Sequence, residues 1–206
     1  VGAILSRADR GGTLNPRELL AVASLLQTAR RALLYDAEHE TKTTLTPIFG
    51  LLSGNRDLEE SITTAIISEE EIADGASPEL LSIRRELRRI SGRGRETLNR
   101  MISGERSKYL QETIITQRNG RFVVPVKAEH RGDVPGLVHD TSSTGATVFV
   151  EPQQVVEINN QIKVLEGCEE AEIERILASL SAEVSMYKGA IEQVYEAYDT
   201  MQKEGN

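Results

Sequence analysis

The sequence has 206 residues, with 24 Lys and Arg against 32 Asp and Glu, and its formal net charge is −8. Only 4% of the residues are aromatic and there is no Trp, a composition more typical of long exposed helices than of a thick enzyme core. The single Cys168 excludes an internal disulfide, and no apolar run approaches the roughly 18 residues of a membrane span. We therefore expect a cytoplasmic protein.

The first 76 residues are expected to form a helical base. Asn15, Pro16 and Glu18 fit the N-cap, the first helical position and the capping box of a helix. A helix is therefore predicted over residues 16–39. After a break at residues 53–55, a weaker helical pattern covers about 56–67.

Residues 77–108 are predicted to form an outgoing lever helix. Ser77 and Pro78 suit its start, and the apolar residues that follow alternate at spacings of three and four, which is a heptad seam: Leu80, Ile83, Leu87 and Ile90. The pattern continues to about Ser103, and Gly104 suits the stop.

Residues 109–151 change to a period of about two and are predicted to form a small β clamp. Asn119–Gly120 lies between two β-rich runs, at 113–118 and 121–127, which predicts a type I′ hairpin. Two shorter strands are expected at about 134–139 and 146–150. Residues 152–206 return to heptad spacing and are predicted to form one returning lever helix.

The expected fold is therefore mainly α with a small antiparallel β unit. Two long antiparallel lever helices would stand on a helical base and carry the β clamp at their tip. The chain begins without Met and ends directly after a heptad run, so we expect it to be a piece of a longer protein.

The acidic total hides a basic segment, because residues 84–108 hold nine Lys and Arg and three acids. Heptad phase directs Arg84, Arg93 and Arg100 toward the acidic returning helix. The others point away from the seam and need water or an external anion: Arg85, Arg88, Arg89 and Arg95. A plain charged face and a nucleic-acid contact both fit them.

The predicted hairpin places Arg118 directly opposite Arg121, with Lys127 on the same outward face. Like charges directly opposite each other destabilise a hairpin, and a phosphate backbone would relieve that repulsion. The alternative is that both arginines extend into water. Candidate nucleic-acid-binding residues are the cations of the hairpin, its surroundings and the outgoing helix: Arg118, Arg121, Lys127, Arg131, Lys108, Arg85, Arg88, Arg89 and Arg95.

No catalytic or metal-binding residues are predicted. His139, Asp140, Ser142 and Ser143 offer a base, an acid and a nucleophile within five residues, but residues so close in sequence seldom converge on one reacting atom. A coiled-coil scaffold that only spaces or dimerises domains remains an alternative to nucleic-acid binding.

Three ordered blocks resemble the second MutS paralogue family of bacteria: residues 119–129 (NGRFVVPVKAE), 134–140 (VPGLVHD) and 144–152 (TGATVFVEP). Residues 76–80, 83–86 and 155–160 are similar to that family as well. The resemblance implies the core, lever and clamp of a MutS-like homodimer that closes around nucleic acid.

The same resemblance implies that the parent protein binds ATP and Mg²⁺ and in many members carries a small MutS-related endonuclease domain. This chain contains no phosphate-loop motif, so no cofactor is expected in it. The implied function is suppression of homologous recombination through binding of branched DNA. The alternative partner is ribosomal RNA, in the rescue of collided ribosomes.

Overall fold

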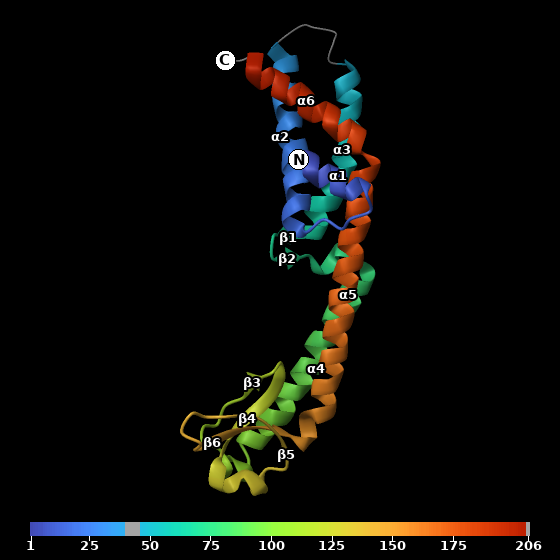
Figure 1. Cartoon of the computed structure of the whole chain (residues 1–206). Coiled ribbons are helices and arrows are strands. Elements are labelled where there is room, and N and C mark those ends of the chain that lie inside the picture. The colour runs from blue at the N-terminus through green and yellow to red at the C-terminus, as the bar shows by residue number, and fades with distance from the viewer. Residues whose placement is uncertain (40–45, 205–206) are drawn as a thin grey trace. The chain divides into compact units, whose positions relative to one another are not determined.

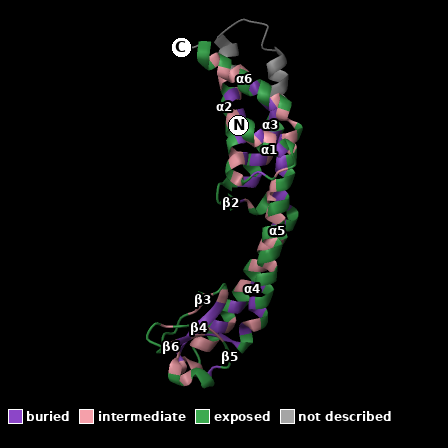
Figure 2. Ribbon diagram, viewed as in Figure 1, coloured by how far each residue is buried: buried purple, intermediate pink, exposed green. Residues whose placement is uncertain are grey.

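The computed structural model describes residues 1–39 and 46–204 (Figure 1). They fall into two compact units, unit 1 (Val1–Leu81 with Ala171–Asn206) and unit 2 (Ser82–Glu170). The fold is mainly helical with two small antiparallel sheets, so the predicted fold class is confirmed. Each unit has its own cluster of buried apolar residues, drawn in purple in Figure 2.

Unit 1 is built from helices and one short hairpin. Its elements are α1 (Gly2–Asp9), α2 (Pro16–His39), α3 (Thr46–Ala65), β1 (Ile66–Ser68), β2 (Glu71–Ile72), the 3₁₀ turn η2 (Asp74–Ala76), the start of α4 (Pro78–Ile102), the end of α5 (Val156–Met186) and α6 (Lys188–Glu204). Leu19, Leu58 and Ile191, from three of these helices, are almost completely buried in one shared core.

Helix starts follow the sequence signals closely. The Glu18 amide donates to Asn15 Oδ1 (2.8 Å), and the Asn15 amide donates to Glu18 Oε1 (3.2 Å), which is the predicted capping box of α2. The Ser77 hydroxyl accepts the Leu80 amide (3.0 Å) at the start of α4. Both helices therefore begin where their caps predict.

Two boundaries in unit 1 differ from the prediction. α3 runs through residues 53–55 without a break, because a glycine within a helix costs only about 1 kcal/mol and burial of Leu58 and Ile62 outweighs it. The returning helix is not continuous, since α5 ends at Met186 and α6 begins at Lys188. α6 then packs against α1, α2 and α3.

Unit 2 places a four-stranded antiparallel sheet against two helical segments. Its elements after α4 are η3 (Glu105–Tyr109), β3 (Thr116–Arg118), β4 (Arg121–Lys127), η4 (Ala128–Asp133), β5 (Gly136–Thr141), β6 (Thr147–Pro152), η5 (Gln153–Val155) and the start of α5. The strand order is β3-β4-β6-β5. α4 and α5 run antiparallel here, because Arg84 pairs with Glu169 (3.1 Å) while Gly94 lies against Ile158.

The predicted hairpin joins β3 and β4. Asn119 (φ 56°) and Gly120 (φ 72°) both have positive φ, as a type I′ turn requires. β3 is shorter than predicted because β4 pairs further along with the segment after η3: Leu110 bridges Val126, and the Gln111 amide donates to the Pro125 carbonyl (2.9 Å). β5 and β6 each begin one or two residues later than predicted.

One face of the sheet rests on α4 and α5. Phe122, Val124 and Val150 are buried on it with Ile90 and Ile158 from the helices. Gly94 permits this approach, because a Cβ at that position would lie 3.2 Å from both the Phe122 ring and the Ile158 methyl group. Gly94 is therefore the place where the hairpin meets α4.

We predict opposite outcomes for the two glycines of α4. Gly92→Ala meets nothing within 4 Å and should raise the free energy of unfolding by about 0.5–1 kcal/mol, because alanine favours the helix. Gly94→Ala gains the same helix propensity, but its new methyl group presses against the Phe122 ring. Its free energy of unfolding should therefore be lower than that of Gly92→Ala by at least about 1 kcal/mol. Urea unfolding followed by circular dichroism measures both, and equal gains would contradict this packing.

Candidate nucleic-acid interface

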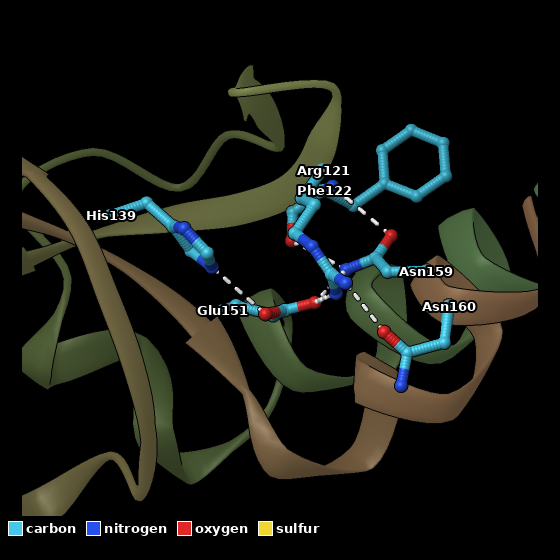
Figure 3. Close-up of polar contacts among 6 residues, drawn as sticks. All are labelled: Arg121, Phe122, His139, Glu151, Asn159 and Asn160. Carbon is cyan, nitrogen blue, oxygen red and sulfur yellow. Dashed lines mark hydrogen bonds and ion pairs between the residues drawn. The ribbon is translucent and has the colours of Figure 1, made fainter. Parts of the chain in front are cut away.

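A fully buried carboxylate lies at the centre of unit 2. Glu151, on β6, has no exposed surface. It accepts hydrogen bonds from the Arg121 guanidinium on β4 and from Asn159 Nδ2 on α5 (2.6 Å), and its Oε1 lies 2.8 Å from His139 Nε2 on β5 (Figure 3). The Glu151 side chain thus binds both strands that flank β6 and one helix.

Asn159 completes the hydrogen bonding of the sheet. The Phe122 amide donates to Asn159 Oδ1 (3.2 Å), and Asn159 Nδ2 donates to the Phe122 carbonyl (3.2 Å). The last β4–β6 pair is Val124 with Val150, so the next partner of Phe122 would be Pro152, which has no N–H to donate. The Asn159 amide therefore takes the place of a strand at this point.

Arg121 lies inside this network and not on the outer surface. Its guanidinium donates to Glu151 and also to Asn160 Oδ1 on α5, and its side chain is only 16% exposed. The expectation that Arg121 extends outward beside Arg118 was therefore wrong. The sequence analysis assigned no role to Glu151, but its place on the strand next to β4 makes it the internal partner of Arg121.

The network holds Glu151 in its ionised form. Burial raises the pKa of the Glu151 carboxyl, but the hydrogen bonds from His139, Asn159 and Arg121 and the charge of Arg121 outweigh this effect, so the pKa lies below its ordinary value. Unit 2 thus contains a buried anion that favours the folded protein above the pH at which carboxylates ordinarily protonate.

Arg118 faces Arg121 in the register, as predicted, but it is bound on the sheet surface. Its guanidinium lies 4.0 Å from the centroid of the Phe149 ring, and its Nε donates to Asp140 (3.2 Å). A further hydrogen bond runs to the Gln117 carbonyl (2.8 Å). Each of the two opposed arginines therefore has its own internal acid, and no external anion is needed to separate them.

The other cations around the sheet are more open. Lys108 and Arg131 are exposed and Lys127 is half-buried, and within the described residues no carboxylate lies within ion-pair distance of these three. The bridge between Leu110 and Val126 brings η3, which carries Lys108, to the end of β4 where Lys127 begins η4. Sequence reasoning named these three residues but did not place them together.

The partners of the α4 arginines differ in part from those predicted. Arg84 pairs with Glu169 on α5 as expected, but Arg100 pairs with Glu96 on its own helix (2.6 Å), which corrects its assignment to the returning helix. Arg89 pairs with Glu86 on α4 (2.6 Å), and Arg95 lies over the Phe122 ring (5.1 Å). Arg85, Arg88 and Arg93 are exposed.

The residues of the weighed enzyme alternative do not converge. His139 contacts buried Glu151, Asp140 contacts Arg118, and the Ser142 hydroxyl accepts the Thr147 amide (3.1 Å) in a turn. Each side chain has a separate structural partner.

Comparison with known proteins identifies the family. No family model matches the chain. Proteins named Endonuclease MutS2 from Ruminiclostridium cellulolyticum, Agathobacter rectalis and Pelotomaculum thermopropionicum are 47%, 44% and 46% identical to it, over 88%, 95% and 96% of this chain. The chain belongs to the MutS2 family. It spans about a quarter of the length of these relatives, 24%, 25% and 25% respectively.

The blocks that resemble MutS2 meet at the Glu151 network. The first block supplies Arg121 and Phe122, the second supplies His139, and the third supplies Glu151. Gly136 of the second block lies so close to β6 that a Cβ would overlap the Glu151 carbonyl oxygen. These motifs of the MutS2 segment therefore build the interior of unit 2, and the open cations lie around it.

We predict that Glu151→Gln lowers the free energy of unfolding at pH 7 by about 2–4 kcal/mol, because Arg121 loses its buried counter-charge. Because the pKa of Glu151 is lowered in the folded protein, its ionised carboxylate stabilises the fold fully above the ordinary glutamate pKa of about 4.3. This stabilisation is lost progressively at lower pH. The difference between the two proteins should therefore shrink from pH 6 to pH 3 in urea unfolding. Glu157→Gln, an exposed change on α5, is the control, and a difference independent of pH would contradict the network.

Proposed function

We propose that unit 2 is the phosphate-binding clamp of a longer MutS2 protein and contacts the backbone of branched DNA. The observation that carries the proposal is the set of three open cations, Lys108, Lys127 and Arg131, which η3 and η4 bring to one end of β4. Cations that are not paired with a carboxylate of the protein are available to displace the counterions of a phosphate backbone.

The distribution of charge supports this proposal. Unit 2 has 14 Lys and Arg against 12 Asp and Glu, a net charge of +2, in a chain whose total is −8. Several of the acids are already engaged: Glu151 with Arg121, Asp140 with Arg118, and Asp133 with His130 (3.0 Å). Among residues 1–39 and 46–204, none of the other acids lies within ion-pair distance of the three open cations.

The expected mode of binding is readout of shape and phosphate spacing. The open cations lie on 3₁₀ turns and at a strand end, and such positions suit contacts to phosphates more than hydrogen bonds to base edges in a groove. Selectivity would then come from the geometry of the DNA branch, and affinity would depend strongly on salt concentration.

The role of the whole protein is part of the same proposal. From the resemblance to the MutS2 family we infer that the whole protein is a homodimer that binds branched DNA, suppresses homologous recombination, and binds ATP and Mg²⁺ outside this chain. We infer endonuclease activity of the whole protein from the relatives, which are named Endonuclease MutS2. Contact with ribosomal RNA is the competing outcome, because ribosomal RNA also presents spaced phosphates to lysine and arginine.

The test is a salt titration of the 206-residue chain on a four-way DNA junction, a linear duplex and ribosomes. We expect the junction to bind most tightly, and we expect Lys108→Gln, Lys127→Gln and Arg131→Gln together to weaken binding. Each lost phosphate contact should reduce the slope of log K against log salt by about 0.9.

The matched control removes the same number of charges from exposed positions of unit 1, with Arg10→Gln, Arg17→Gln and Arg31→Gln. A similar loss in both triple variants would indicate a general charge effect and refute the proposed site. Absence of binding even at about 50 mM salt would favour a scaffold, and preference for ribosomes would favour ribosomal RNA as the partner.

A further inference from the structure

An aromatic pair lies among the open cations of unit 2. The rings of Tyr109 on η3 and His130 on η4 have centroids 5.0 Å apart and are tilted by 43°. Lys108 Nζ lies 5.2 Å from the centroid of the Tyr109 ring. Two turns that are separate in the sequence, at residues 105–109 and 128–133, thus form one small surface of rings and positive charge.

The pair is anchored on one side and accessible on the other. Tyr109 packs partly against the apolar cluster of unit 2, while the His130 side chain is 37% exposed and its Nδ1 is held by Asp133. The ammonium over the Tyr109 ring belongs to an exposed lysine, so a larger planar group can displace it. The rings are held in place without being enclosed.

We propose that Tyr109 and His130 form a stacking platform for an unpaired nucleotide base of a DNA branch. This inference rests on the proposed function and extends it from phosphates to bases. Aromatic side chains beside cations bind single strands through base stacking together with phosphate contacts. Lys108, when displaced from the Tyr109 ring, is positioned to contact the phosphate that accompanies the stacked base.

The platform selects an unpaired base over a paired one. Both faces of a base inside a duplex are covered by its neighbours, whereas a base at a fork, gap or opened junction has a free face. Because all bases have such a face, no sequence preference is expected. The phosphate contacts would hold the branch while the ring pair holds one base from its unpaired segment.

The test compares a forked DNA that carries 2-aminopurine in its unpaired arm with a fully paired duplex, using the whole chain. The unaltered chain and Tyr109→Phe, which keeps the ring, should quench the 2-aminopurine fluorescence on binding. Tyr109→Leu should abolish the quenching and reduce affinity for the fork by roughly 5- to 100-fold. Affinity for the duplex should not change.

His130→Ala, a change at a half-buried side chain, should also weaken quenching and provides a second test if Tyr109→Leu does not fold. Quenching that persists in both variants overturns the platform, although salt-dependent binding by the unaltered chain would still support the proposed function. Absence of any DNA binding by the unaltered chain overturns both. Quenching only when the unpaired arm is RNA overturns the assignment to DNA.

Discussion

The ionised Glu151 carboxylate is the constraint on which unit 2 depends. A buried charge is costly unless every hydrogen-bonding position is satisfied, and here the donors come from β4, β5 and α5. The strands and the helix must therefore take up their relative positions together. A small sheet gains from this arrangement a geometry that apolar packing alone would leave less specific.

Internal acids divide the cations around the sheet of unit 2 into two groups. Arg121 and Arg118 are bound by internal acids and maintain the structure of the sheet. Lys108, Lys127 and Arg131 lie beyond the reach of those acids. Charge counted along the sequence cannot make this distinction, because it depends on which acid the neighbouring strand places beside each cation.

Local signals in the sequence predicted local structure well. The capping box at Asn15, the cap at Ser77 and the Asn119–Gly120 turn all lie where they were expected. The inward direction of Arg121 was not predictable from alternation alone, because it arises from a contact with Glu151, 30 residues later. The helix break near Tyr187 was likewise missed, because the heptad spacing continues through it. The break allows α6 to pack against α1, α2 and α3.

The substitution of the Asn159 amide for a strand has a mechanical consequence. An ordinary helix that packs on a sheet can slide or rotate slightly while the backbone pairing of the strands stays intact. Here the first turn of α5, which carries Asn159, is itself part of the backbone pairing of β4, through both the N–H and the carbonyl of Phe122. A rotation of α5 at this position would therefore displace the β3–β4 hairpin directly, because the helix and the strand are linked by these two hydrogen bonds.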